Sequence, residues 1–267
     1  MVSALTIWRL LELETHDAFM NMAIDDSVLQ ARMENLVPNT VRFYRWNPSA
    51  VSIGRFQDIE KEVQLENCRK NGVDVVRRIT GGGTVYHSSA DEITYSVIVR
   101  KGDLATEDIN EVYKKIYSGL MQGIQALGLQ ADFDQGSERA CPNLTISGKK
   151  ISGSAQAHRR GVVLQHGTLL LKVDLEKMFT FLRVPWANTP MQVVNVAKSK
   201  ITSLNGEICR ETTVHEVSEA LIAGFEKTFA VRFEAGHLTP FETDLSEQLC
   251  REKYRNDDWN RLGNFLS

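Results

Sequence analysis

Apolar residues recur three and four positions apart in several stretches of the chain, which is the spacing of one helix face. The stripe at residues 109–127 is the most regular, and Gly128 follows it as a stop signal. In an earlier stretch of this kind, Asp25 and Asp26 fall outside the apolar positions. The pattern predicts helices over residues 17–33, 63–71, 109–127, 174–182 and 213–229.

Strand patterns separate these helices. Alternation over residues 40–46, a turn at 47–49 and an apolar run over 50–54 predict a β-hairpin. Further strands are expected over residues 73–78, 93–99, 144–147, 150–156 and 162–173. Paired strands with helices between them favour an α+β fold, with mixed, mainly antiparallel sheets flanked by helices, over a strictly alternating parallel arrangement.

Composition narrows the class of protein. The 267 residues contain 31 Lys and Arg against 34 Asp and Glu, and a formal net charge of −3 offers no general field for a nucleic acid. No window approaches the roughly 18 consecutive apolar residues of a membrane-spanning helix. The first residues lack the pattern of a secretory signal. We therefore expect a cytoplasmic protein that binds neither nucleic acid nor membrane.

No repeat, low-complexity tract or linker marks a domain boundary. We expect one domain, with residues 1–240 as its main part and 241–267 as a C-terminal helical extension. The cysteines are widely spaced, which argues against both a disulfide framework and a zinc site. We expect no metal site built by the protein, and reduced thiols at Cys68, Cys141, Cys209 and Cys250.

The sequence RRITGGGTVYH at residues 77–87 is the first stretch that could carry chemistry. Three successive glycines permit positive φ and remove every Cβ, so backbone N–H groups could close on an anionic oxygen or a flat ligand. Arg77 and Arg78 add positive charge that can grip a phosphate or carboxylate. The alternative is an ordinary mobile turn.

Two further stretches place polar residues in small or apolar surroundings. Lys149 and Lys150 precede the small residues 152–155, so a ligand could pass beneath a lysine, although paired lysines at a hairpin tip are usually solvated. His166 interrupts an apolar strand, where a hydrogen-bonded core histidine is more common than a catalytic one. The same alternative applies to His87.

Together, RRITGGGTVYH, GKKISGSAQ and QHGTLLL, with VRFYRWNP upstream, resemble the lipoate–protein ligase and octanoyltransferase family, whose fold is shared with biotin–protein ligases. The resemblance runs from Asn21 to Asn260 and covers a catalytic domain without the added C-terminal domain of many ligases. It implies that residues 1–240 attach lipoate or octanoate to a protein.

The resemblance also implies site residues. In the ligases an Arg-x-Ser-Gly-Gly-Gly stretch lines the lipoyl-adenylate pocket, and here Thr80 replaces the usual serine. The lysine before Ile-Ser-Gly is Lys150, which is the implied catalytic residue. The implied binding residues are Arg78, Thr80, Gly81, Gly82, Gly83, Thr84, Val85, Tyr86, His87, Asn143 and His166.

The main prediction from this resemblance is an AMP-forming lipoate–protein ligase. It would couple lipoate to ATP, with Mg²⁺ bound to the nucleotide, and pass the acyl group to a lysine of a lipoyl carrier domain. Glycine cleavage H protein and 2-oxoacid dehydrogenase E2-like domains are such carriers. Gly83 favours this prediction, because the transferases have arginine there. A separate small accessory subunit would complete a two-part ligase.

The alternative is an octanoyl-acyl-carrier-protein:protein octanoyltransferase. Residues 91–97 look more like these transferases, and Cys141 stands in the loop where they place a nucleophile. Cys141 would carry the octanoyl group as a thioester without ATP, Lys150 would stabilise the oxyanion, and Arg139 could lower the pKa of the thiol. A third hypothesis is a homologue that binds lipoyl groups without catalysis.

Overall fold

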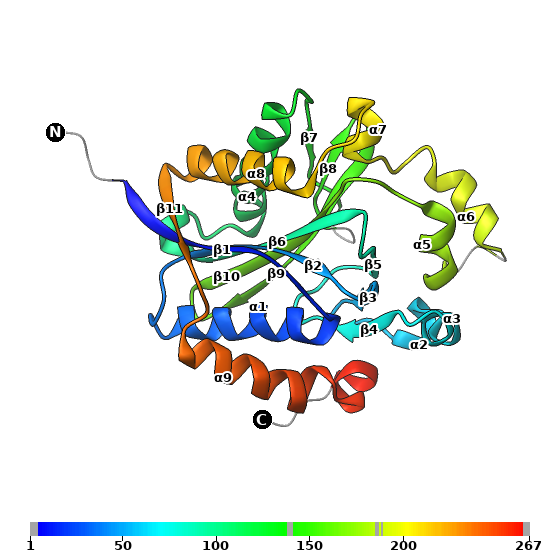
Figure 1. Ribbon diagram of the computed structural model, residues 1–267, viewed down its shortest axis with the longest axis horizontal. Helices are drawn as coiled ribbons and strands as arrows, with labels where there is room; N and C mark the ends of the chain where they lie inside the picture. Colours follow the sequence, from blue (N-terminus) through cyan, green and yellow to red (C-terminus); the bar gives the residue numbers. More distant parts are fainter. Residues whose placement is uncertain (1–4, 138–140, 185–186, 188, 264–267) are drawn as a thin grey trace.

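The computed structural model describes residues 5–137, 141–184, 187 and 189–263, and its centre is a large twisted sheet with helices on both faces (Figure 1). The strand order of this sheet is β11-β1-β2-β6-β10-β9-β8-β7. Its neighbouring strands are antiparallel, apart from β1 with β11 and β1 with β2. The strands are β1 (Thr6–His16), β2 (Thr40–Trp46), β6 (Glu92–Arg100), β7 (Asp132–Asp134), β8 (Asn143–Ile146), β9 (Lys149–Arg159), β10 (Val162–Leu170) and β11 (Val231–Gly236).

A smaller sheet has the order β4-β3-β5, formed by β3 (Ala50–Ile53), β4 (Asp74–Arg77) and β5 (Val85–His87). The predicted hairpin of residues 40–46 with 50–54 is therefore wrong. A strand has two edges, and both edges of β2 are taken by β1 and β6. β3 instead pairs with β4 and β5, which brings the glycine-rich loop between those two strands beside it.

Helices pack on both faces of the large sheet (Figure 1). α1 (Ala18–Met33) and α9 (Pro240–Leu249) lie together on one face, and α4 (Ile109–Ala126) and α8 (Val214–Phe229) on the other. The predicted α+β fold with a mainly antiparallel sheet is confirmed. The remaining helical segments are α2 (Ile59–Glu62), α3 (Leu65–Lys70), η1 (Lys101–Leu104), α5 (Leu175–Phe181), α6 (Pro190–Ala197), α7 (Leu204–Ile208), η2 (Cys250–Tyr254) and η3 (Asp258–Leu262).

Side-chain caps explain where two of the long predicted helices begin. Asp17 accepts a hydrogen bond from the backbone N–H of Met20 at the start of α1, and Asp108 accepts one from Glu111 at the start of α4. Such caps satisfy backbone donors that have no partner within the helix. The apolar stripe of α4 then packs with α8 in a core on one side of the sheet. α1 packs in a second core on the other side.

The C-terminal segment is bound to the N-terminal half of the chain. The Lys253 ammonium and the Tyr254 hydroxyl both donate to Asp26 Oδ2, at 2.7 and 2.9 Å. The Arg77 guanidinium donates to backbone carbonyls of residues 54, 55 and 57 and of residues 259–261. These contacts hold β4, and with it the start of the glycine-rich loop, in place. The division after residue 240 stays a prediction.

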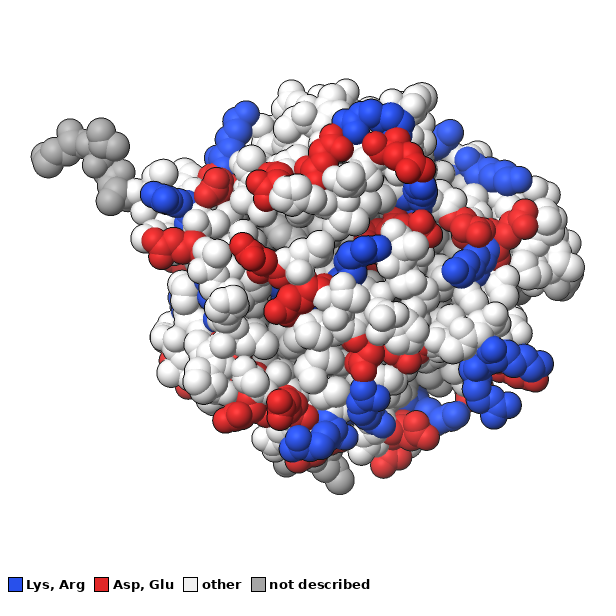
Figure 2. Space-filling view, in the orientation of Figure 1, with Lys and Arg blue, Asp and Glu red and all other residues white. Residues whose placement is uncertain are grey.

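The hydropathy of the helices and the distribution of surface charge are relevant to possible partners. Within the described residues, no helix has the length and apolar character needed to cross a membrane. Figure 2 shows basic and acidic side chains interspersed over the face in view.

Candidate active site

A cavity of about 670 Å³ opens where the two sheets meet the glycine-rich loop. Its walls come from both sheets, from α1 and α4, and from the segment before β8, so residues distant in sequence share one space. Apolar and aromatic side chains share the lining with about as many polar ones, so the cavity offers both apolar surface and hydrogen-bonding groups to a small molecule. The lining includes Met22, Tyr44, Trp46, Ser52, Arg78, Gly82, Gly83, Thr84, Val85, His87, Thr94, Tyr113, Cys141, Asn143, Lys150, Gly153, Ala155 and His166.

Arg78 donates hydrogen bonds to the backbone of the glycine-rich loop and to the neighbouring strand. Its Nη2 donates to the carbonyls of Gly81 and Gly83, both at 2.9 Å, and its Nη1 donates to the carbonyl and the hydroxyl of Ser52. Its Nε donates to Thr80 Oγ1. All five N–H groups of this guanidinium therefore have protein acceptors. Burial lowers the pKa of Arg78 to about 10, which still leaves it charged near neutral pH.

Cys141 borders the same cavity. A Cβ built on Gly82, which has a φ of +84°, would lie 3.6 Å from Cys141 Sγ, so the thiol is packed against the loop. Asn143 donates to the carbonyl of Cys141 at 3.2 Å, and Tyr117 donates to the next carbonyl, that of residue 142. The backbone around the thiol is thus held from two sides. Arg139, expected to lower its pKa, lies outside the described residues.

A β-bulge sets the direction of Lys150. In the β8–β9 hairpin the register shifts by one after Leu144, so that Lys150 pairs with Thr145 and Ile151 is an extra residue. Side chains alternate between the two faces of a regular strand, and the extra residue turns Lys150 to the face of Gly153. A Cβ built on Gly153 would come 2.6 Å from Lys150 Nζ, so the ammonium lies over that glycine.

The surroundings of Lys150 suit a charge that acts on a ligand. The residue as a whole is exposed, but it lines the cavity and its ammonium lies against Gly153. Burial of the ammonium lowers the pKa of Lys150, and the neighbouring Cys141 and Asp134 oppose that shift. Tyr113 lines the cavity too. Burial first, and then the nearby thiol, raise the pKa of its hydroxyl, which therefore stays protonated and can donate.

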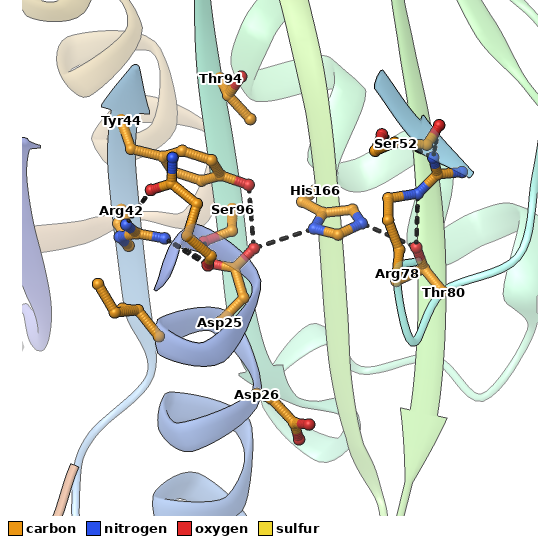
Figure 3. Close-up of polar contacts among 12 residues, drawn as sticks. Asp25, Asp26, Arg42, Tyr44, Ser52, Arg78, Thr80, Thr94, Ser96 and His166 are labelled. Atoms are coloured by element: carbon orange, nitrogen blue, oxygen red, sulfur yellow. Dashed lines mark hydrogen bonds and ion pairs between the residues drawn. The ribbon is translucent and has the colours of Figure 1, made fainter. Parts of the chain in front are cut away.

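Asp25 lies at the centre of a buried hydrogen-bond network behind the cavity. Its carboxylate accepts from Arg42, Tyr44, Ser96 and His166 at 2.9 to 3.0 Å. Burial alone would raise the pKa of Asp25, but the hydrogen bond from His166 and the charge of Arg42 outweigh it, and the net pKa is lowered. Figure 3 shows Asp25 on α1 with these side chains gathered around it.

The structure brings most of the predicted site residues to the cavity, with three exceptions. Thr80 is fully buried behind the loop, and Gly81 turns its carbonyl to Arg78. Tyr86 points away and stacks on Phe181, with ring centroids 5.2 Å apart. Sequence reasoning missed Asp25, Ser52, Glu92 and Tyr113. In the sequence, Asp25 stood out only as one of two adjacent acids outside the apolar positions of its helix.

The arrangement can support acyl transfer. A thiol and an ammonium face one cavity, and thiolates are good nucleophiles toward activated carbonyls. The ammonium can stabilise negative charge on a carbonyl oxygen under attack. Met22, Trp46 and Val85 offer apolar surface for an aliphatic chain.

Comparisons with known proteins bear on this chemistry. Residues 17–226 match the family described as the lipoyl protein ligase A/B catalytic domain. The octanoyltransferase LipM of Brevibacillus brevis is 37% identical over 272 residues, which cover 95% of this chain and 98% of that protein. The octanoyltransferase LipM of Geobacillus kaustophilus is 37% identical over 273 residues, with the same coverage of both chains.

A solved structure is similar over nearly the whole chain. It is described as a bi-partite lipoate protein ligase and its E2 lipoyl domain from Thermoplasma acidophilum. The TM-score is 0.84 at 27% identity, and the match covers 98% of this chain and 99% of the other. One fold thus carries both ligase and transferase activities among the similar proteins, so the fold alone does not select the reaction.

These findings correct the prediction of an AMP-forming lipoate ligase that uses ATP and Mg²⁺. The two relatives that are 37% identical over 95% of this chain are named octanoyltransferases, whereas the similar ligase structure is 27% identical. The prediction relied on Gly83 as a sign of a nucleotide pocket. In the structure the carbonyl of Gly83 accepts from Arg78, so this glycine takes part in an internal contact that requires no nucleotide.

Proposed function

Because the chain belongs to the lipoyl protein ligase A/B catalytic-domain family, we propose that it is an octanoyltransferase that works through a thioester on Cys141. The donor is an octanoyl thioester on acyl carrier protein, and the acceptor is the target lysine of a lipoyl carrier domain. The observation that carries the proposal is the position of Cys141, with its thiol against the glycine-rich loop and in the same cavity as Lys150.

The reaction has two steps. First, Cys141 Sγ attacks the carbonyl carbon of the donor thioester, a new C–S bond forms, the donor C–S bond breaks, and the donor thiol leaves with the proton of the Cys141 thiol. Second, the ε-amine of the carrier lysine attacks the carbonyl carbon of the Cys141 thioester, the C–N bond of an amide forms, the C–S bond to Cys141 breaks, and a proton from the amine restores the Cys141 thiol. The Lys150 ammonium faces the carbonyl oxygen in both steps, where negative charge develops.

The energetics of this route require no nucleotide. A thioester is already an activated acyl group, whereas a free carboxylate needs prior coupling to AMP. The reaction therefore needs no adenylation step and no second subunit for such a step. Glycine cleavage H protein and E2-like lipoyl domains are the acceptor class that we propose. All four cysteines are unpaired, which fits our placement of the reaction in the reducing cytoplasm.

The test uses purified protein, octanoyl-acyl-carrier-protein and an apo lipoyl domain, without ATP, followed by mass spectrometry of all three. We expect the mass of one octanoyl group first on the enzyme at Cys141 and then on the lipoyl domain. Cys141→Ser should abolish both, because serine at its ordinary pKa is a much weaker nucleophile than a thiolate. Cys209→Ser is the matched control, since Cys209 is exposed and is not among the cavity residues.

A second arm supplies lipoate with Mg·ATP in place of the octanoyl donor. Modification of the lipoyl domain only in this arm would contradict the transferase proposal. Transfer from the octanoyl donor by Cys141→Ser at the wild-type rate would contradict the thioester on that residue.

A further inference from the structure

Two buried chains of hydrogen bonds converge on Arg78. In the first, His166 Nδ1 lies 2.9 Å from Asp25 Oδ2, and His166 Nε2 lies 2.8 Å from Thr80 Oγ1. Thr80 Oγ1 in turn accepts from Arg78 Nε at 3.3 Å. Figure 3 shows the ring of His166 between the carboxylate and the hydroxyl, with Arg78 beyond them. The order is carboxylate, imidazole, hydroxyl, guanidinium.

The second chain repeats this order with Glu92 of the large sheet and with His87 and Ser52 of the small sheet. His87 Nδ1 lies 2.7 Å from Glu92 Oε1, and His87 Nε2 lies 2.7 Å from Ser52 Oγ. Ser52 Oγ accepts from Arg78 Nη1 at 2.8 Å. The ring of His87 also stacks on Trp46, with centroids 4.0 Å apart, which fixes its plane. Each carboxylate, imidazole and hydroxyl in both chains is buried.

The directions of the hydrogen bonds are consistent along the first chain. Burial lowers the pKa of His166, so the ring is neutral near pH 7 and carries one proton. That proton lies on Nδ1, where the carboxylate of Asp25 can only accept. Nε2 must then accept from the hydroxyl of Thr80, which leaves the Thr80 oxygen free to accept from Arg78. The hydroxyl is therefore needed as both donor and acceptor.

Arg78 connects the two chains of hydrogen bonds to the glycine-rich loop. Its remaining N–H groups hold the carbonyls of Gly81 and Gly83. In a trans peptide the N–H points opposite to the carbonyl, so the N–H groups of Gly82 and Thr84 are turned away from Arg78. Gly82 is also the loop residue packed against Cys141 Sγ. The orientation of the guanidinium thus determines how the loop faces the thiol.

We propose that Asp25 and Glu92, acting through His166 and His87, are positioning residues for acyl transfer: the two chains fix Arg78, and Arg78 fixes the glycine-rich loop beside Cys141. The expected effect on the rate of acyl transfer rests on the proposed function. The expected effect on the conformation of the glycine-rich loop does not.

The hydroxyl of Thr80 offers the sharpest test, because valine matches the shape of threonine without the hydroxyl and serine keeps the hydroxyl. We expect Thr80→Val to lower the rate of octanoyl-thioester formation on Cys141 about 10- to 100-fold, since small displacements at a reaction centre cost this much. The KM for the octanoyl donor should change by less than about threefold. Thr80→Ser should recover most of the lost rate.

A second measurement follows the loop directly. Hydrogen exchange of the peptide that contains residues 80–86, read by mass spectrometry, should be faster in Thr80→Val than in wild type and close to wild type in Thr80→Ser. Thermal unfolding of the three proteins shows whether the comparison is made on folded protein.

The outcomes separate the two proposals. Equal acylation rates and equal loop exchange in wild type and Thr80→Val would overturn the positioning role. An equal loss of rate in Thr80→Val and Thr80→Ser would also overturn it, because the size of the side chain and not its hydroxyl would then be responsible. If wild type forms no octanoyl thioester, the proposed function fails, and the exchange measurement alone decides the positioning role.

Discussion

At the scale of single residues, the charged side chains around the cavity have two different tasks. Arg77 and Arg78 look alike in sequence as anion ligands, yet both direct their guanidinium donors to protein carbonyls and hydroxyls. Lys150 extends over Gly153 into the cavity. A guanidinium has five fixed donors and suits several backbone acceptors at once, whereas an ammonium on a flexible stem suits a transient charge. We therefore assign the electrostatic role in the reaction to the lysine.

This assignment predicts different effects at two adjacent lysines. Lys150→Ala should lower the rate of carrier octanoylation about 100-fold, the usual cost of removing one donor that stabilises an oxyanion. Lys149→Ala, which changes a residue outside the cavity lining, should stay within about twofold of wild type. Steady-state rates on folded protein check both. An essential Lys149 beside a dispensable Lys150 would show that the wrong lysine has been chosen.

At the scale of elements, a single inserted residue in β9 decides where that lysine points. The bulge at Ile151 is a local change of register between two strands that otherwise pair regularly. The β8–β9 hairpin itself is close to what the sequence predicts. Its bulge is not, because the pattern of residues 149–156 does not show which residue is extra.

The close approach of Lys150 to Gly153 predicts the effect of a single methyl group. Gly153→Ala would place a Cβ 2.6 Å from Lys150 Nζ, and the flexible lysine must move away while the strand keeps its shape. We expect the rate of carrier octanoylation to fall about tenfold, with little change in thermal stability.

Gly102→Ala is the matched control, because a Cβ there meets nothing within 4 Å. It should leave the octanoylation rate unchanged. A Gly153→Ala enzyme that is as active as the control would show that the position of the ammonium over Gly153 is not needed for transfer.

At the scale of the whole molecule, the site depends on contacts between segments far apart in the chain. Asp25 of α1 meets His166 of β10, and Asp26 meets Lys253 and Tyr254 near the C-terminus. The cavity lies where these segments converge, so its geometry and the stability of the fold are linked. Protonation of a buried group such as His166 should then change the free energy of unfolding of the whole protein.

The lowered pKa of His166 predicts how stability depends on pH. Below its ordinary pKa of about 6.5 the unfolded chain binds a proton that the folded chain excludes, so the free energy of unfolding should fall as the pH drops from 7 to 5. One such group contributes a slope of up to about 1.4 kcal/mol per pH unit. His158, whose pKa is lowered by burial as well, adds to the slope.

Urea unfolding at several pH values measures this slope, and His166→Gln serves as the comparison. Glutamine does not titrate in this range, so the variant should show a smaller slope whatever its absolute stability. Identical slopes in the two proteins would contradict the prediction. The lowered pKa of Asp25 acts in a separate window, near and below its ordinary value of 3.8, and should not affect the comparison.

Elements whose pattern is local could be predicted from the sequence. The helices at residues 17–33, 109–127 and 213–229 and the hairpin around Gly148 appear close to their predicted bounds. Apolar spacing, capping side chains and turn residues act over a few positions, so they can be read directly from the chain. The glycine-rich loop and the pair Lys149 and Lys150 were also candidates by their residue types, whereas Cys141 and the choice of Lys150 were implied by the resemblance to a known family.

Contacts between groups that are distant in sequence could not be predicted, because they depend on how the whole chain packs. The predicted hairpin at residues 40–54 failed because both edges of β2 are occupied by strands from elsewhere in the chain. The acid of α1 that binds His166, and the second chain from Glu92 to Arg78, were invisible for the same reason. A buried polar group must find a hydrogen-bond partner, and the partner is set by the packing of the whole fold rather than by neighbours in sequence.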